Sequence, residues 1–129
     1  MKNLYINISP DLIYYPIVDF NAETGICEIS GESYMEETYT FYEPIITWLR
    51  SFVELRKKLV LDIKLTYFNT SSSRFILEML DVLKSFKNQG GDVSVNWYYR
   101  EEDPDMLNEI NDISGETGLD FNIIKFKKK

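Results

Sequence analysis

The chain has no histidine and a single cysteine, Cys27, among its 129 residues. The lack of histidine excludes Ser-His-Asp and Cys-His catalysis, histidine-ligated metal sites and the usual pH switch near neutrality. One cysteine cannot form an internal disulfide. Because Cys27 alternates with the apolar residues Ile26 and Ile29 in a predicted strand, we interpret it as a buried, unreactive thiol.

Long apolar segments and an excess of positive charge are also missing. No segment approaches the ~20 apolar residues of a membrane span, and the N-terminal residues lack a signal-peptide pattern, so we expect a cytoplasmic protein without membrane insertion. The 21 acidic residues outnumber the 14 basic ones and give a formal net charge of −7. This balance disfavours nucleic acid as a partner, because phosphate binding requires clustered Lys and Arg. We interpret the basic run at 127–129 as a solvated tail.

The chain does contain enough apolar and aromatic side chains for one core. Hydrophobic residues make up 44% of it and aromatic residues 15%, which predicts a single globular domain over 1–129. The first third is typical of β-structure, with strands expected at 4–8, 13–20 and 26–30. Pro16 marks an edge strand or a bulge. The turn at 21–25 joins the last two strands into a hairpin, and we expect 31–33 to close it.

The remainder alternates helices with strands. We expect helices at 42–56, at 72–88 before Gly90-Gly91, and from Asp103 to Gly115 or Gly118, and strands at 59–68, 93–97 and 119–123. Thr40 and Glu43 have the spacing of a capping box before the first helix, with Pro44 in its first turn. Such alternation predicts parallel strands joined by crossover helices.

The strand at 59–68 indicates how the layers are arranged. One set of side chains is apolar: Leu59, Leu61, Ile63, Leu65 and Tyr67. The other set is polar: Asp62, Lys64 and Thr66. A strand between two helix layers would be apolar on both faces. We therefore predict an α/β fold whose mixed sheet carries an N-terminal hairpin and has helices mainly on one face.

The junction between this strand and the next helix is rich in hydroxyl groups: Asn69-Thr70-Ser71-Ser72. A helix N-terminus presents free N–H groups and the positive end of the helix dipole, which favours a phosphate. One hypothesis is therefore a switch controlled by phosphorylation of Thr70. Serine and threonine also cap helices, and the residues alone favour a cap at Thr70. The two roles could be divided, with Ser71 or Ser72 as the cap.

Other polar and aromatic groups have structural explanations. We interpret the acidic residues Glu101, Glu102, Asp103 and Asp105 as a solvated loop and helix cap rather than as a Mg²⁺ or acid–base site. No Gly-rich phosphate loop is present. We expect Trp48 and Trp97 in the core, Tyr98 on the opposite sheet face, and Tyr67 bracing the strand end from the core side. These residues predict no cofactor, no metal and no enzymatic activity.

The order of elements and the hydroxyl-rich turn resemble the STAS-like fold of bacterial anti-anti-sigma factors, which carry Asp-Ser-Ser-Gly at this turn. The chain more closely resembles the SiaC family of regulatory phosphoproteins. The matching segments are Phe20-Asn21 with Gly25, Gly31-Glu32-Ser33-Tyr34, Tyr39, Phe41-Tyr42, Pro44, Trp48-Leu49, Tyr67 to Ser72, Val95 to Tyr99 and Asp103 to Met106.

The resemblance implies a non-enzymatic partner switch. The resemblance implies that Thr70 is the phosphate acceptor and that the turn and the docking surface are shaped by Asn69, Ser71, Ser72 and Arg74. Arg74 stands where the family resemblance leads us to expect a Lys. A kinase of the histidine-kinase-like ATPase fold would add the phosphate, and a PP2C-type phosphatase would remove it. The dephosphorylated form would bind and activate a diguanylate cyclase. Any Mg²⁺, Mn²⁺ or ATP belongs to those partners. The alternative is a STAS-like module that binds a small molecule or nucleotide without phosphorylation.

Overall fold

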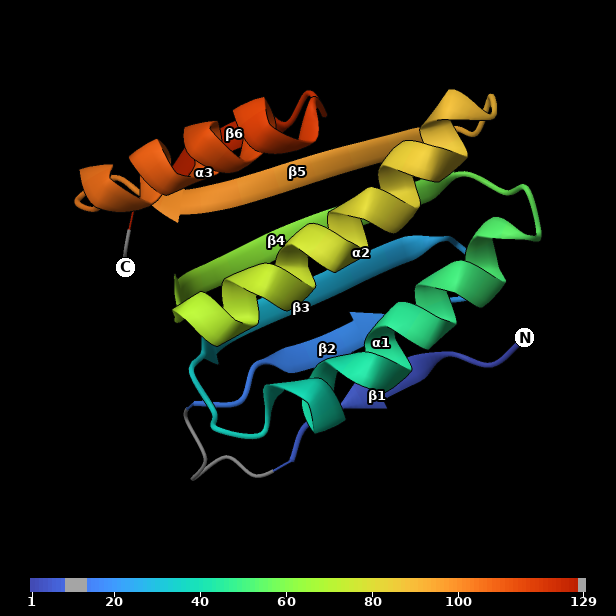
Figure 1. The fold of residues 1–129 in the computed structure, drawn as a ribbon, viewed down its shortest axis with the longest axis horizontal. Coiled ribbons are helices and arrows are strands. Elements are labelled where there is room, and N and C mark those ends of the chain that lie inside the picture. Colours follow the sequence, from blue (N-terminus) through green and yellow to red (C-terminus); the bar gives the residue numbers. More distant parts are fainter. Residues whose placement is uncertain (9–13, 128–129) are drawn as a thin grey trace.

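A computed structural model describes residues 1–8 and 14–127. Ile13, the predicted start of the second strand, and Lys128 and Lys129 of the predicted solvated tail lie outside the described residues. The elements in chain order are β1 (Leu4–Ile6), β2 (Ile17–Phe20), β3 (Ile26–Ser33), α1 (Thr38–Val53), β4 (Leu59–Phe68), α2 (Thr70–Asn88), β5 (Val93–Arg100), α3 (Pro104–Thr117) and β6 (Asn122–Phe126). They form a six-stranded sheet in the order β1-β2-β3-β4-β5-β6 (Figure 1).

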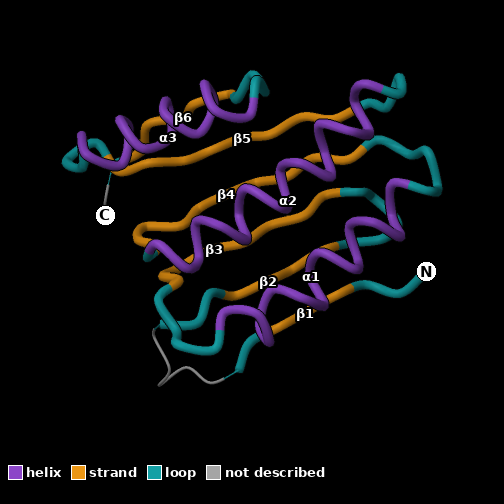
Figure 2. Tube along the Cα trace, viewed as in Figure 1, coloured by secondary structure: helices purple, strands orange, loops and turns teal. Residues whose placement is uncertain are grey.

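The sheet is mixed, as the sequence predicts. β1, β2 and β3 pair antiparallel, whereas β3, β4, β5 and β6 pair parallel. Each helix connects one parallel strand to the next, and all three helices cover the same face of the sheet (Figures 1 and 2). The prediction of an N-terminal hairpin and of helices on one face is therefore confirmed. No helix in the described part of the chain combines the length and apolar character needed to cross a bilayer.

The core lies between the sheet and the helix layer. β4 contributes Leu59, Leu61, Ile63 and Leu65, all buried as their alternation predicts. The helices face them with their apolar stripes, which include Ile45, Leu49, Phe52, Ile76, Met79, Leu80 and Leu83. Trp97 of β5 is fully buried and packs against Phe68 and Phe121 at ring-centroid distances of 6.2 and 5.5 Å.

The first helix begins and ends earlier than predicted. It starts at Thr38, and its N-cap residue Glu37 makes no side-chain capping bond, so the expected capping box of Thr40 and Glu43 is wrong. Pro44 consequently lies inside the helix. Burial of Phe41 and Tyr42 explains the earlier start, because the first turn gains apolar contacts that local capping signals do not describe.

The boundaries of β3 and β6 also differ from the sequence expectation. β3 continues to Ser33, whereas 31–33 was expected to close the hairpin, because pairing with β4 supplies hydrogen-bond partners over that stretch. β6 covers Asn122–Phe126 instead of 119–123, since it pairs with Asn96 to Arg100 of β5 while Leu119 is buried in the preceding connection. Gly118 is the left-handed C-cap of α3, and Gly115 lies inside that helix.

A bulge near the end of β4 changes which side chains reach the surface. Gly31 pairs with Leu65, but Glu32 pairs with Tyr67, so Thr66 is an extra residue in β4. A bulge inverts the alternation of the side chains that follow it. Phe68 therefore points into the core, and Tyr67 is 50% exposed. The expectation that Tyr67 braces the strand from the core side is wrong for this reason.

Candidate functional site

The turn between β4 and α2 is built around Asn69. Its backbone N–H donates to the carbonyl of Ser33 over 3.0 Å, which ties the turn to the end of β3. Its side-chain Oδ1 accepts the Ser72 N–H at 2.8 Å, so Asn69 is the N-cap of α2. The idea that Thr70, Ser71 or Ser72 serves as the cap is corrected by this geometry, because that position is already occupied by asparagine, one of the most favourable N-cap residues.

Thr70 is the first residue of α2 and is exposed. Its backbone carbonyl accepts a hydrogen bond of 2.7 Å from Ser73 Oγ, but its own hydroxyl makes no hydrogen bond within residues 1–8 and 14–127. The Thr70 side chain is therefore not needed to satisfy the helix end. It presents a hydroxyl to solvent at the positive end of the helix dipole.

Ser72 lies behind the turn and is fully buried. Ser33 Oγ donates to Ser72 Oγ over 2.8 Å and is 2.6 Å from the Tyr42 hydroxyl. Since the Ser33 proton is directed at Ser72, Tyr42 is the donor to Ser33. Burial raises the pKa of Tyr42 to about 12, so the phenol remains protonated and able to donate at neutral pH.

This buried hydroxyl chain, Tyr42–Ser33–Ser72, joins α1, β3 and α2 directly beneath Thr70. It follows that Ser72 shapes the turn from the inside and that its side chain has no exposed surface for a partner, which corrects its expected place in the docking surface. Ser71 and Arg74 are exposed. Arg74 follows Thr70 by four residues in α2, so both lie on the same helix face.

Exposed and half-buried tyrosines lie near the turn. Tyr67 contacts Tyr34 edge to face at a centroid distance of 5.5 Å, and Tyr34 contacts Tyr14 in the same way at 5.4 Å. Tyr39, which is 68% exposed, lies 6.3 Å from Phe75 of α2. Tyrosine is enriched at protein interfaces because it offers a large rigid surface with a polar end. Sequence reasoning missed this surface, since it forms only when β3, β4 and the segment before β2 are brought together.

The remaining candidate residues have structural roles. Asp103 accepts the Met106 N–H at 3.1 Å and caps α3, as predicted. No cluster of three or more thiol or carboxylate side chains in the described part of the chain could hold a metal ion. Cys27 is fully buried, and burial together with the charges of Asp62 and Asp19 raises the pKa of its thiol.

The aromatic side chains outside the turn also fall where the sequence places them. Trp48 stacks on Phe52 at 5.1 Å and Trp97 is buried, which confirms both as core residues. Trp97 Nε1 is buried without a hydrogen-bond partner among the described residues. Tyr98 lies on the opposite sheet face beneath the Lys64 ammonium, which is 5.0 Å from its ring centroid.

Comparisons with known proteins show what this chain resembles in sequence and in fold. The sequence pattern of the SiaC family of regulatory phosphoproteins matches residues 11–126. An uncharacterized protein of Pseudomonas aeruginosa strain UCBPP-PA14 is 32% identical over 100 residues, which is 77% of each chain. The crystal structure of apo-SiaC from Pseudomonas aeruginosa is 26% identical, with a TM-score of 0.80 over 97% of this chain and 98% of that one.

A second solved structure is that of the diguanylate cyclase SiaD in complex with its activator SiaC from Pseudomonas aeruginosa. The match has a TM-score of 0.88 at 26% identity and covers 95% of this chain and 99% of that one.

Proposed function

Because this chain belongs to the SiaC family of regulatory phosphoproteins, we propose that it is a partner switch that binds its effector when Thr70 is unmodified and releases it when Thr70 is phosphorylated. The observation that carries the proposal is that helix capping and hydroxyl exposure belong to different residues of the turn. Asn69 caps α2, which leaves the Thr70 hydroxyl exposed and without a hydrogen-bond partner in the described part of the chain. A kinase can therefore reach this hydroxyl without opening the fold.

The phosphate acts on docking rather than on folding. Phosphorylation adds a charge of about −1.5 to −2 and three acceptor oxygens. At the first residue of α2 this charge is stabilised by the helix dipole, and Arg74 lies one turn further along the same face. A partner seated over the turn, in contrast, would have to desolvate the dianion. A hundredfold loss of affinity requires only about 2.7 kcal/mol, which is within the reach of one misplaced charge.

We infer a diguanylate cyclase as the effector, with activation as the result of binding. The support is the close structural match to SiaC in its complex with SiaD. The tyrosines beside Thr70 offer this chain a surface on which such an effector would dock. A kinase of the histidine-kinase-like ATPase fold and a PP2C-type phosphatase would set the phosphorylation state in the cytoplasm. ATP and divalent metal belong to those enzymes, and this chain performs no catalysis of its own.

The test uses three purified forms of the chain: Thr70→Ala, Thr70→Glu and protein carrying phosphothreonine at position 70. Thr70→Ala serves as bait in native lysate, and a captured cyclase is purified and titrated by calorimetry with each form. We expect Thr70→Ala to bind and to raise cyclic di-GMP production, and both charged forms to bind at least about tenfold more weakly. Circular dichroism establishes that each form is folded.

Ser85→Glu is the matched control, because it adds the same charge to an exposed position near the other end of α2. It should bind like the unmodified protein. Equal cyclase affinity for the Thr70→Ala and phosphothreonine forms, both folded, would reject the switch. Thermal stabilisation by a small molecule, with no phosphate on native Thr70, would favour the ligand-binding module instead.

A further inference from the structure

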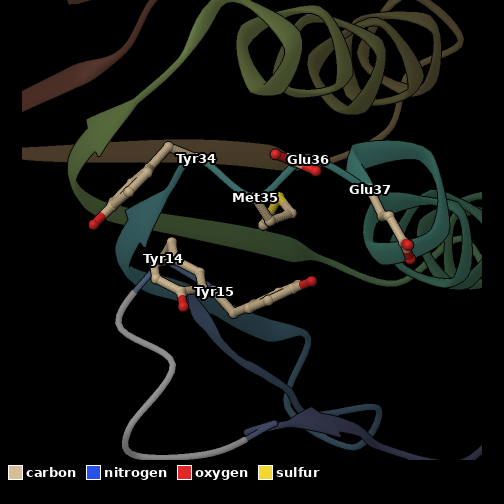
Figure 3. A pocket seen from close by; sticks show the side chains of 6 residues that line it. All are labelled: Tyr14, Tyr15, Tyr34, Met35, Glu36 and Glu37. Carbon is tan, nitrogen blue, oxygen red and sulfur yellow. The ribbon is translucent and has the colours of Figure 1, made fainter.

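A pocket of about 440 Å³ lies beside the tyrosines that flank the turn. Its lining residues are Tyr14, Tyr15, Tyr34, Met35, Glu36 and Glu37. Figure 3 shows that the first two come from the segment leading into β2 and the other four from the segment between β3 and α1. The two segments are held together by a backbone hydrogen bond of 3.1 Å from the Tyr34 N–H to the Tyr14 carbonyl.

The pocket walls are aromatic rings in mutual contact. Tyr14 lies 6.0 Å from Tyr15 and 5.4 Å from Tyr34, measured between ring centroids. Tyr15 is in turn anchored on Phe41 of α1 at 5.7 Å. Met35 is 3% exposed, and its polarizable thioether forms the floor of the pocket between the rings. These contacts build the pocket before any partner arrives, so little ordering is needed on binding.

The charge of the pocket has one sign. The Glu36 and Glu37 side chains are exposed at its edge, and no Lys or Arg is among the described residues that line it. Desolvation, and to a smaller extent the neighbouring Glu32 carboxylate, raises the pKa of Tyr34, so this phenol stays neutral at physiological pH. An anionic ligand would meet repulsion here. A cation would be attracted both by the carboxylates and by the negative faces of the rings.

We propose that this pocket receives an arginine side chain of the effector that docks over Thr70. The proposal rests on the proposed function for the identity of the partner. A guanidinium is planar, stacks on aromatic faces and donates two parallel hydrogen bonds to a carboxylate, whereas an ammonium is a compact, strongly hydrated charge. Aromatic rings in the pocket walls and carboxylates at the pocket edge therefore favour an arginine over a lysine side chain.

The pocket is continuous with the turn. Tyr34 belongs to its wall and also contacts Tyr67, which precedes Thr70 by three residues. The residue before Tyr34, Ser33, accepts the backbone N–H of Asn69. A partner that covers the exposed Thr70 hydroxyl consequently extends over the pocket as well. Arginine is among the residues that most often dominate binding energy when seated in such a site.

The chemistry of the pocket is tested with a small probe on the full chain. N-acetyl-arginine amide is titrated while NMR follows the Met35 methyl group and the tyrosine rings. N-acetyl-citrulline amide is the neutral probe of the same shape. We expect saturable shifts with the arginine probe, weaker shifts in Glu36→Gln/Glu37→Gln, and none with citrulline. Equal responses to the two probes would overturn the proposal.

The effector is then tested with a matched pair of variants. Glu36→Gln/Glu37→Gln removes two pocket carboxylates, and Glu23→Gln/Glu54→Gln removes two exposed carboxylates elsewhere, so the net charge changes equally. The pocket variant should bind the cyclase about tenfold more weakly than the control variant, the loss typical of one anchoring contact. Equal affinities would overturn the proposal.

These outcomes separate the proposal from the switch on which it rests. If Thr70→Glu binds the cyclase normally while the pocket variant binds weakly, the switch is wrong and the arginine site is supported. If Thr70→Glu abolishes binding while the pocket variant matches its control, the switch is supported and the arginine site is rejected.

Discussion

Removal of the Ser33 hydroxyl should destabilise the protein more than removal of either neighbouring hydroxyl. Ser33 is the middle of the chain Tyr42–Ser33–Ser72, with hydrogen bonds of 2.6 and 2.8 Å, and Ser33 and Ser72 are fully buried. Ser33→Ala breaks both bonds and leaves the Tyr42 and Ser72 hydroxyls without partners. A buried polar group left unsatisfied costs about 1–3 kcal/mol. We therefore expect a loss of about 2–4 kcal/mol.

The two end variants provide the comparison. Tyr42→Phe leaves the bond between Ser33 and Ser72 intact, and Ser72→Ala leaves the bond between Ser33 and Tyr42 intact. Each should lower the free energy of unfolding by about 1 kcal/mol, the usual net value of one hydrogen bond. Because the three groups form one network, the losses should not add. Ser72→Ala should have little further effect when introduced into Ser33→Ala, since it removes a group that is already orphaned.

Urea denaturation of the four variants and the unmodified chain measures these differences. The slope of the unfolding free energy against urea should stay constant, which establishes that only stability has changed. A loss for Ser33→Ala no larger than that for Tyr42→Phe would refute the reasoning. So would strict additivity of Ser33→Ala and Ser72→Ala.

Three further predictions concern the core and the turns. Burial raises the pKa of Tyr42 to about 12, above the ~10 of an unfolded tyrosine. The contribution of the protonated Tyr42 phenol to the free energy of unfolding is therefore complete below pH ~10 and is lost as the pH rises toward 12. Denaturation at several pH values should show the stability advantage over Tyr42→Phe shrinking in that window, and a constant difference would contradict it. The buried Cys27 thiol should not react with a thiol reagent in the native protein and should react in urea; rapid native labelling would refute this. Gly115→Ala should raise the unfolding free energy by about 0.5–1 kcal/mol, because Gly115 lies in α3 with open space around its Cβ position. Gly25→Ala should lower it by more than about 2 kcal/mol, because Gly25 has a φ of 75° and the added Cβ would collide with the Lys58 carbonyl oxygen. Similar effects of the two glycine substitutions would show that this steric argument fails.

The fold was predictable where the signal is local. The β4 boundaries, the end of α2 before Gly90-Gly91 and the Asp103 cap of α3 all follow from side-chain periodicity, from a helix-ending glycine or from a residue and its neighbour three positions away. The start of α1 was not predictable from local sequence, because its first turn is stabilised by burial of Phe41 and Tyr42 rather than by a cap. The exposure of Tyr67 was missed for a similar reason: the bulge is defined by pairing between β3 and β4.

The sequence by itself determined the order and type of the elements and the position of Thr70 at a strand–helix junction, because periodicities of two and about 3.6 residues are properties of neighbouring residues. Only the tertiary structure decided that Ser72 turns inward and that three tyrosines and two carboxylates line one pocket. Ser33 and Ser72 are separated by 39 positions and meet only when β3, β4 and α2 pack together. Contacts of this kind depend on the free energy of the whole core, which no short segment of the chain contains.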